Sequence, residues 1–274
     1  MHMTEPPIVM GILNRTPDSF YDAGEYWGFD DFLRKAKQLV ADGADMLDVG
    51  GVKAGPGSEV TEDEEMERVV PAVKALADRF DLPLSIDTWR ASVADEAYKS
   101  GAVLGNDISG FADTEYLQVA AAHGVSVVAC HVRLAPRLAD PNPIYTDLFG
   151  DVKSYLAERV AWAQAVGIPK SRVYVDAGLD LGKTPEMSAA LLRRSGDLGE
   201  ELGCPVLLSA SNKGFLGVLC DGEIGERAIA SAAAHALGTL QGCRILRVHD
   251  VRATKVVVET LQRLSRQNSL EFGN

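Results

Sequence analysis

Eight short apolar runs, each followed by a longer segment with helical spacing, constrain the fold of this chain more than any other feature. Continuous apolar runs are typical of parallel strands, because helices cover both faces of such a sheet. The runs span residues 8–14, 46–51, 82–88, 102–108, 125–132, 172–178, 205–211 and 244–250. Eight strand–helix pairs predict an α/β protein with a single (β/α)8 TIM barrel that occupies residues 1–274 as one domain.

The segments between the strands carry the apolar spacing and the stop signals of amphipathic helices. Helices are predicted at residues 30–43, 62–80, 92–101, 151–167, 225–242 and 250–264. Glycine favours the left-handed conformation that ends a helix, and it occurs at Gly43, Gly101, Gly124, Gly167 and Gly242. A doubly wound sheet is the alternative fold, but it usually has a GxGxxG turn after its first strand, and this chain has none there. The polar tail, 265–274, is expected to fray.

The composition argues against several classes of partner. A net charge of −12 and a pI near 4.9 disfavour nucleic acid or an anionic membrane as the main partner. No apolar run approaches the roughly 20 residues of a membrane span, and the N-terminus lacks a signal segment. The four cysteines have no CxxC spacing and lie in or beside apolar or small-residue runs, so reduced, buried thiols are expected rather than disulfides or metal ligands. We therefore expect a cytoplasmic protein that acts on small molecules.

Polar side chains stand at the C-terminal ends of the predicted strands, where a barrel of this kind holds its active site. Taken singly, each is as readily a helix cap, because Asp, Asn and Ser are the best capping residues. The role of a cap or loop former is expected for Asp107, Ser109, Asp113 and Asp250.

A second group of strand-end residues has a composition that suits a flat polar ring. Four strands contribute one residue each, and these should meet at one mouth of the barrel: Asp87, Asn106, Asp176 and Lys213. A carboxylate can accept two hydrogen bonds from an amino-pyrimidine edge, and a lysine can donate to a ring carbonyl. On the last strand, Arg247 and His249 would hold an anion, and the arginine could instead stack on a ring.

These residues fall in segments that resemble the dihydropteroate synthases, a family of pterin-binding barrel enzymes. The matching segments cover most of the chain and read MGILNRTPDSFYDAG, DVGG…PG, SIDT…VADEA…GA…NDISG, CHV, DAGLDLGKT, SNKGFLG and RVHDV. Their order, spacing and barrel positions agree together, and the pattern is closest to the divergent second copy that mycobacteria carry. The resemblance implies an enzyme of folate biosynthesis that joins a dihydropterin methyl pyrophosphate to p-aminobenzoate, while pyrophosphate leaves with the help of Mg²⁺.

The resemblance also assigns ligand-binding roles to individual residues. The residues that would hold the pterin are Asp87, Asn106, Asp176, Lys213 and Arg247, the last by stacking on the ring. The pyrophosphate would lie among Asn14, Arg247 and His249. Asn14 would also help to place the Mg²⁺ ion.

Catalytic and assembly roles follow from the same resemblance. Asp18 and Asp22, in the loop after the first strand, would close over the reaction, and Lys213 would act beside them. The second loop and the start of the helix after the seventh strand would hold p-aminobenzoate or sulfa-type analogues. The family's dimers imply a homodimer here.

The chain departs from the family pattern where p-aminobenzoate would be held. In the second loop the family's GGESTRPG reads GGVKAGPG, so Lys53, Ala54 and Gly55 replace serine, threonine and arginine. After the seventh strand the family's SRKS reads SNKG, and Gly214 replaces a serine that would hydrogen-bond the benzoate carboxylate. The backbone N–H groups at this helix start are still expected to be open to an anion.

The segment after the sixth strand departs as well, since Leu181 replaces an aromatic residue and Asp180 adds a negative charge near an anionic substrate. These changes, beside an intact pterin-facing set, predict a homologue with weak or no synthase activity. The alternative is an active synthase with a rebuilt benzoate site. A pterin methyltransferase shares the barrel but fits the loop after the first strand and the SNKGFLG segment less well. A purely structural dimer partner, joined through the two C-terminal helices, is the remaining alternative.

Overall fold

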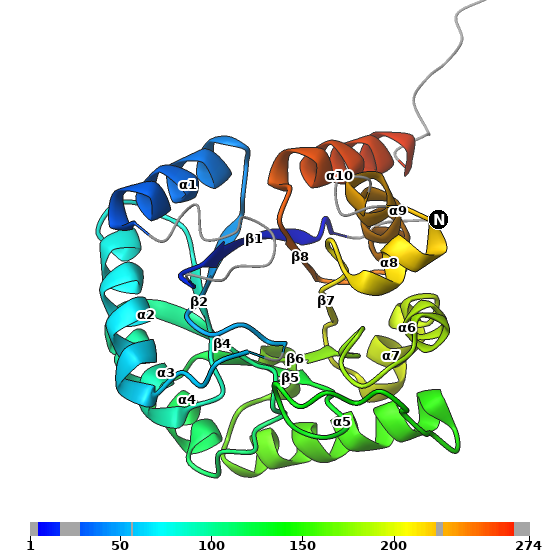
Figure 1. Ribbon diagram of the computed structural model, residues 1–274, viewed down its shortest axis with the longest axis horizontal. Coiled ribbons are helices and arrows are strands. Elements are labelled where there is room, and N and C mark those ends of the chain that lie inside the picture. Colours follow the sequence, from blue (N-terminus) through cyan, green and yellow to red (C-terminus); the bar gives the residue numbers. More distant parts are fainter. Residues whose placement is uncertain (1–4, 17–27, 56, 223–226, 266–274) are drawn as a thin grey trace, which may run out of the picture.

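The computed structural model describes residues 5–16, 28–55, 57–222 and 227–265, which form a ring of strands inside a ring of helices (Figure 1). The sheet has eight parallel strands in the order β6-β5-β4-β3-β2-β1-β8-β7. Their bounds are β1 Ile8–Asn14, β2 Met46–Gly50, β3 Leu84–Asp87, β4 Ala102–Asp107, β5 Ser126–Cys130, β6 Val173–Asp176, β7 Leu207–Leu208 and β8 Ile245–Val248. A parallel bridge between Val175 and Val206 joins the two ends of this order, so the barrel is nearly closed. The predicted (β/α)8 barrel is confirmed.

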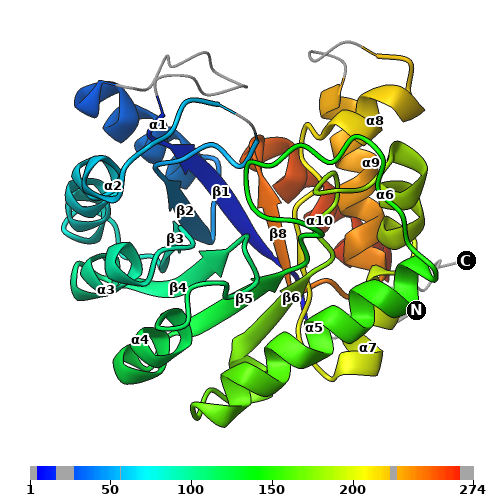
Figure 2. The same ribbon diagram turned by 60° about the horizontal axis from the view of Figure 1, so that its bottom comes forward.

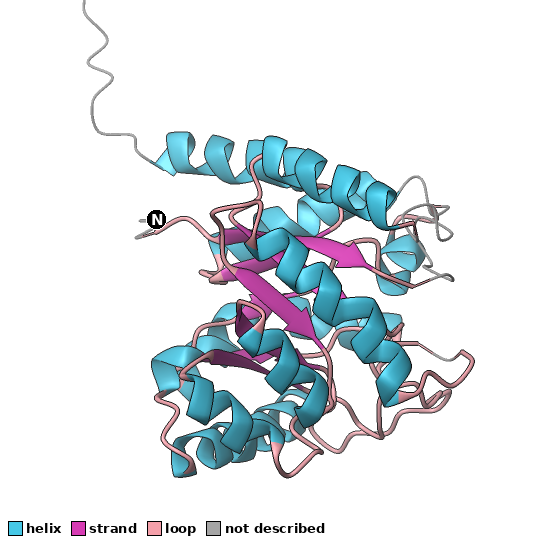
Figure 3. Ribbon diagram, turned by 90° about the vertical axis from the view of Figure 1, so that its left-hand side faces the viewer, coloured by secondary structure: helices cyan, strands magenta, loops and turns pink. Residues whose placement is uncertain are grey.

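Helices cover the outside of the strands on all sides (Figures 2 and 3). Within the described residues they are α1 Phe29–Ala41, α2 Glu62–Ala77, α3 Ala91–Lys99, α4 Tyr116–His123, α5 Leu148–Ala165, α6 Pro185–Leu192, α7 Ser195–Leu202, α8 Gly214–Leu219, α9 Arg227–Leu240 and α10 Val251–Ser265, with a 3-10 turn at Lys170–Arg172. Two helices follow β6 and two follow β7, so the regular alternation of strand and helix is expanded at these two points.

The residues that begin and end the helices have the expected local geometry. The Thr61 hydroxyl accepts a hydrogen bond from the Glu64 N–H at 3.2 Å and so caps the start of α2. The five glycines expected to end helices all have positive φ, with values of 93° at Gly43, 116° at Gly101, 64° at Gly124, 95° at Gly167 and 80° at Gly242. The expected fraying of the tail concerns residues that lie outside the described part, apart from Ser265, which ends α10.

Most strands are one to three residues shorter than predicted, and β7 is shortened most. The run 205–211 gives a β7 of only two residues. The Val206 carbonyl accepts hydrogen bonds from the N–H groups of both Arg244 and Ile245, at 2.8 and 3.2 Å. This doubled contact interrupts the regular ladder at the start of the strand.

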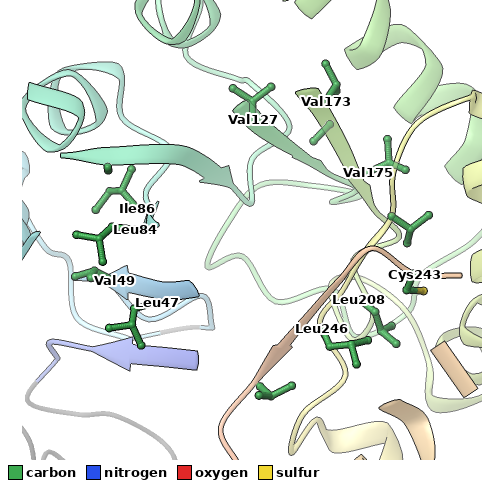
Figure 4. Packing of buried hydrophobic residues seen from close by; sticks show 14 of the residues in the cluster. Leu47, Val49, Leu84, Ile86, Val127, Val173, Val175, Leu208, Cys243 and Leu246 are labelled. Atoms are coloured by element: carbon green, nitrogen blue, oxygen red, sulfur yellow. The ribbon is translucent and has the colours of Figure 1, made fainter. Parts of the chain in front are cut away.

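Apolar side chains form two layers, one on each side of the sheet. Inside the barrel a small cluster is formed by Met10, Met46, Leu104, Val128, Leu207 and Ile245. A larger cluster lies between the strands and the helices (Figure 4) and includes Leu47, Val49, Leu84, Ile86, Val127, Val173 and Val175. Successive residues of a strand point to opposite faces, so each buried strand supplies both layers. In a barrel of this kind the packed interior is not a channel, and ligands bind at the carboxyl ends of the strands.

Candidate active site at the barrel mouth

The register of the sheet places three of the expected site residues side by side at one end of the barrel. Asn14 of β1 pairs with Gly50 of β2, Gly50 pairs with Asp87 of β3, and Asp87 pairs with Asn106 of β4. A Cβ atom at Gly50 would lie 3.4 Å from Asn14 Oδ1 and 3.6 Å from Asp87 Oδ2. With glycine here, no side chain stands between these two polar groups.

Arg247 of β8 joins the opposite side of the mouth to this row. Its Nε donates to Asp48 Oδ2 at 2.6 Å, and its Nη2 donates to Asp87 Oδ2 at 2.7 Å. Asp48 is fully buried, and its Oδ2 also lies 3.4 Å from the Nδ2 of Asn106. Burial alone would lower the pKa of Arg247, but the charges of Asp48 and Asp87 outweigh it and raise that pKa. The guanidinium is thus a fixed cation that holds two acidic groups in place.

No role was predicted for Asp48 from the sequence. Its position in an apolar run, between Leu47 and Val49, nevertheless indicates that it is buried. A carboxylate inside a fully buried strand needs a charged partner, because burying an unpaired charge is strongly unfavourable. The partner, Arg247, lies 199 residues away along the chain. Asp48 therefore belongs to the site as the group that orients Arg247.

Burial favours the neutral form of Asp87. It is the largest influence on the pKa of this carboxyl and raises it, while Arg247 opposes this shift and Asp48 adds to it. Two carboxylates that share one guanidinium compete for its charge, so the second is held less firmly in its ionised form. A carboxyl group of this kind can both accept and donate a hydrogen bond at the edge of a ligand.

Asp176 and Lys213 form the other polar side of the mouth. Asp176 is buried at the end of β6, and its Oδ1 accepts from the Gly178 N–H at 2.8 Å. Burial raises the pKa of Asp176, and the positive charge of Lys213 is the largest opposing influence. The Lys213 ammonium donates to the Leu179 carbonyl oxygen, which keeps it over the same strand end. Asp176 and Lys213 are therefore close enough for the charge of the lysine to act on the carboxylate.

A cavity of about 260 Å³ opens at this mouth. Its lining includes the expected ligand-binding residues Asn14, Asp87, Lys213, Arg247 and His249, and the altered loop residues Lys53 and Ala54. Asn106 and Asp176 are outside the lining but adjoin it, the first as the strand partner of Asp87 and the second through the charge of Lys213. Asp18 and Asp22 lie outside the described residues. The other ring-facing and anion-facing residues named from the sequence are therefore gathered at one place.

His249 enters this cavity as a neutral group. Its Nδ1 lies 3.0 Å from the Ser211 hydroxyl, and its backbone N–H donates to the same oxygen at 3.1 Å. Burial, together with the nearby charges of Arg247 and Lys35, lowers the pKa of His249 to about 3. An anion at this end would therefore meet the imidazole as a hydrogen-bonding group and Arg247 as the charge.

The buried lysine Lys183, for which no role was predicted, fixes the turn after β6. The Nζ atom of Lys183 lies 2.9 Å from His131 Nδ1 and donates to the carbonyl oxygens of Gly178 at 2.9 Å and Leu181 at 3.0 Å. Burial lowers the pKa of Lys183 to about 8 and that of His131 to about 3. This cluster holds the loop that carries Leu181 against β5.

The start of α8 differs from the expectation drawn from the sequence. Asp180 Oδ2 accepts from the Phe215 N–H at 3.3 Å, so the prediction that these backbone groups stay open to an anion is wrong for Phe215. Gly214 is exposed and offers no hydroxyl group. A second cavity, of about 220 Å³, adjoins this point and is lined in part by Ala54, Gly55, Asp180 and Leu181. All five altered positions thus lie on the borders of the two cavities or at the start of α8.

Asp107 and Asp250 accept hydrogen bonds from nearby backbone N–H groups. Asp107 accepts from the N–H groups of Ser109 and Phe111 at 2.6 and 2.9 Å, and Asp250 accepts from Ala253 at 2.9 Å, so both are loop or cap residues as predicted. All four cysteines are free thiols, but Cys220 is exposed at the end of α8, so the expectation of burial is wrong for it. Among the described residues, no group of three or more His, Cys, Asp or Glu side chains is arranged to hold a metal ion. No helix of the described part is both long and apolar enough to cross a bilayer.

Known proteins are similar to this chain in both sequence and fold. A family model described as pterin binding enzyme matches residues 10–249. The dihydropteroate synthase of Bacillus subtilis (strain 168) is 39% identical over 271 residues, which cover 98% of this chain and 92% of that protein. The structure of Yersinia pestis dihydropteroate synthase with a sulfonamide drug complex has a TM-score of 0.91 and 36% identity, over 96% of this chain and 95% of that one. The Xanthomonas albilineans dihydropteroate synthase with 4-aminobenzoic acid has a TM-score of 0.89 and 35% identity, over 96% of this chain and 95% of that one.

Proposed function

The chain belongs to the dihydropteroate synthase family of pterin-binding enzymes, and on that premise we propose that it binds the dihydropterin but condenses it with p-aminobenzoate weakly or not at all. The first half of this proposal rests on the ring-facing residues, which are present and paired. The second half rests on the residues that would hold the aromatic amine, which are altered at three places.

The pterin half of the proposal is supported by the charges and hydrogen-bonding groups at the mouth. Asp176, Asp87 and Asn106 offer acceptors and donors for the amino-pyrimidine edge, and Lys213 offers a donor for the ring carbonyl. Arg247 is anchored by Asp48 and Asp87, so its planar guanidinium has a fixed orientation beside the cavity. A planar cation held in this way is suited to stack on a bicyclic ring.

The pyrophosphate and metal roles are proposals from the same geometry. Asn14, Arg247 and His249 line one cavity, where Arg247 supplies the charge and the other two supply hydrogen bonds. Mg²⁺ keeps several water ligands and takes few protein ligands beside phosphate oxygens, so the single amide oxygen of Asn14 fits it. When bound, Mg²⁺ would neutralise charge on the departing pyrophosphate.

The single observation that carries the proposed loss of activity is the contact between Asp180 and the start of α8. The Phe215 N–H, which could otherwise receive an anion, is used by the Asp180 carboxylate at 3.3 Å. An incoming benzoate carboxylate would meet this negative charge, and Gly55 and Gly214 supply neither a guanidinium nor a hydroxyl. A hydrogen bond to a charged group contributes about 1.5–3 kcal/mol. Two or three such losses would lower synthase efficiency by about 1,000-fold or more.

An active synthase with a rebuilt second site is the other candidate, and Lys53 favours it. This lysine lines the mouth cavity and restores one positive charge to the second loop. It lacks the planar fork that lets arginine hold a carboxylate through two hydrogen bonds. We regard it as a partial replacement, because a single flexible ammonium positions a substrate less well.

We also propose that the protein is a homodimer joined through α9 and α10, which pack against each other along the outside of the barrel (Figure 1). Large apolar side chains are exposed on these helices, including Ile229 at 82% and Val256 at 59% exposure. Analytical ultracentrifugation would test this: a dimer that I229D/V256D converts to a folded monomer supports the proposal, and a wild-type monomer at micromolar concentration contradicts it.

The experiment that tests the proposed function is a synthase assay with the purified full chain, beside the Bacillus subtilis relative. The substrates are the dihydropterin pyrophosphate and p-aminobenzoate, with Mg²⁺. The proposal expects a kcat/KM at least about 1,000-fold below that of the relative. A value within tenfold of the relative would refute it and favour the active synthase.

A further inference from the structure

We propose that the second cavity binds a ring-shaped amine that carries a neutral or cationic hydrogen-bond donor, and that Asp180 excludes aromatic carboxylates from it. This inference rests on the proposed function, because it names the class of second ligand that the altered side of the mouth would accept. We call this space the β5–β6 cavity. It has a volume of about 220 Å³.

The β5–β6 cavity lies where three loops meet. Its lining comes from the second loop at Ala54 and Gly55, from the long connection between β5 and α5, and from the turn after β6. Figure 2 shows the connection between β5 and α5, in green, running across the same end of the barrel as α8. Ala54 lines both this cavity and the mouth cavity, so the two spaces adjoin. A ligand in one would therefore lie next to a ligand in the other.

The walls of the β5–β6 cavity suit an apolar ring. Side chains of Val132, Leu134 and Leu181 contribute to the lining, and Leu134 is 48% exposed. Apolar walls with a small number of polar groups at the edge are typical of sites for small organic ligands. The polar groups then decide which substituents the ring can carry.

The cations around the cavity are already engaged. The Lys183 ammonium has three hydrogens, and it lies within 3.0 Å of three acceptors, namely His131 Nδ1 and the carbonyl oxygens of Gly178 and Leu181. Arg133 is paired with Asp140, with Nη2 to Oδ1 at 2.6 Å.

Arg137, the third cation at this border, ties two loops together. Its Nη2 donates to the Ser58 carbonyl oxygen at 2.5 Å, and its backbone N–H donates to the Ala54 carbonyl oxygen at 3.2 Å. Ser58 is not among the residues that line the cavity. The guanidinium therefore joins the second loop to the β5–α5 connection.

Asp180 is the acidic group at the edge of the cavity beside α8. Its Oδ2 accepts from the Phe215 N–H at 3.3 Å, and its Oδ1 lies 3.4 Å from the Ser188 hydroxyl. Its φ of 66° is in the left-handed region, which aspartate adopts more readily than most other residues with a side chain. The two contacts fix the carboxylate in place at this turn.

Gly214 completes the arrangement. A Cβ atom at this position would lie 3.4 Å from Asp180 Oδ2, so a side chain here would stand directly against the carboxylate. With glycine at this exposed position, no side chain covers the carboxylate from α8, and Asp180 is itself partly exposed. A ligand amide or amidinium could donate to this carboxylate, whereas a ligand carboxylate would be repelled by it.

The test is isothermal calorimetry on the full-length protein with three arylamines of matched shape: p-aminobenzoate, p-aminobenzamide and p-aminobenzamidine. Titrations are made with and without the dihydropterin pyrophosphate. The inference expects the amide and the amidine to bind at least tenfold more tightly than the benzoate. Tighter binding of the benzoate, or binding of none of the three at millimolar concentration, would overturn it.

Two variants assign the preference to Asp180. Asp180→Asn keeps the shape and removes the charge, and it should reduce the preference to threefold or less. Asp197→Asn, which removes a similar charge from the exposed surface of α7, is the matched control and should leave the ratio unchanged. An unchanged ratio in Asp180→Asn refutes the assignment, and a preference for the amide and amidine that is lost in Arg137→Ala but kept in Asp180→Asn would refute it as well. The wild-type ranking stands by itself if a variant does not fold.

Failure of this inference and failure of the proposed function give different results. Efficient formation of dihydropteroate from p-aminobenzoate refutes the proposed function. An absence of turnover, together with equal binding of the three arylamines, leaves the proposed function in place and refutes only the role of Asp180.

Discussion

The two sides of the barrel mouth differ in how firmly their residues are held. On the ring-facing side, Asp48, Asp87 and Arg247 lie on strands and are joined by hydrogen bonds of 2.6 and 2.7 Å. On the side of the second substrate, the altered positions lie on loops or at a helix start, and Ala54 and Gly214 have almost no side chain to offer. Strand residues are fixed by the sheet register, whereas loop residues can change without disturbing the core. The difference teaches that one binding half can be retained while its neighbour diverges.

The largest expected effect comes from removing the side chain of Arg247, which joins Asp48 and Asp87 on the ring-facing side. Arg247→Ala would leave Asp48 and Asp87 as buried, unpaired acidic groups, which is expected to lower the free energy of unfolding by about 3–5 kcal/mol. Binding of the dihydropterin pyrophosphate should also be lost. Urea unfolding and calorimetry would measure the two effects.

A matched control for this change is Arg263→Ala, since Arg263 is 81% exposed and pairs with Glu259 only at 3.9 Å. It should unfold like the wild type. If Arg247→Ala also behaved like the wild type, the contrast between a paired, rigid side and a divergent side would not hold.

The next effect tests the second-substrate side by restoring it. The variant K53S/A54T/G55R/G214S is expected to raise synthase turnover at least tenfold, because it returns groups that bind a carboxylate. Adding Asp180→Gly should raise turnover by about tenfold more, since it frees the Phe215 N–H. An assay of the four-fold and five-fold variants, with Asp180→Gly alone as a control, would measure both steps. No gain in either variant would mean that the altered loops do not limit the reaction.

A smaller effect concerns the contribution of two buried histidines to the pH dependence of stability, to which the raised pKa of Asp87 contributes with the opposite sign. Burial lowers the pKa values of both His131 and His249 to about 3, well below the ordinary value of 6.5. The unfolded chain therefore takes up protons first, so the stability these groups contribute is present above pH 6.5 and is lost as the pH falls toward 3. Between pH 7 and 5 the loss should be about 1–2 kcal/mol for each histidine.

Chemical unfolding at pH 7, 6 and 5 would measure this slope. His249→Gln should reduce it, whereas His123→Gln, on the exposed surface beside Asp95, should not. Equal slopes in the two variants would contradict the assignment of the slope to the mouth.

The smallest expected effect is that of Lys53→Ala. Because Lys53 is a flexible, partly exposed loop residue, its removal should weaken binding of the dihydropterin pyrophosphate only about threefold, and less at high salt. Calorimetry at 50 and 500 mM salt would detect this change. A loss of a hundredfold or more would show that Lys53 has taken over the part of the missing arginine, and the two sides would then be less unequal than they appear.

The sequence predicted the fold, and it predicted that polar strand-end residues lie at one mouth, because both depend on short-range patterns. Apolar runs identify the strands, glycines mark the helix ends, and strand ends necessarily meet at one mouth. The pairing of Asp48 with Arg247, the cluster of Lys183 with His131, and the contact of Asp180 with Phe215 were not predicted. Each joins segments that come together only through the closed barrel or a particular loop conformation. The short β7 and the exposed Cys220 escaped prediction for the same reason, since the apolar pattern does not report how a segment is packed.

The central claim is that one half of the site is kept and the other is lost, and separate calorimetric titrations of the two half-sites test it most directly. The dihydropterin pyrophosphate and p-aminobenzoate would each be titrated into this protein and into the Bacillus subtilis relative under the same conditions, the benzoate in the presence of pyrophosphate and a non-reactive pterin. The account predicts a dissociation constant for the pterin ligand within tenfold of the relative, and binding of p-aminobenzoate at least 100-fold weaker. Equal binding of p-aminobenzoate by the two proteins, or no binding of the pterin ligand here, would contradict it.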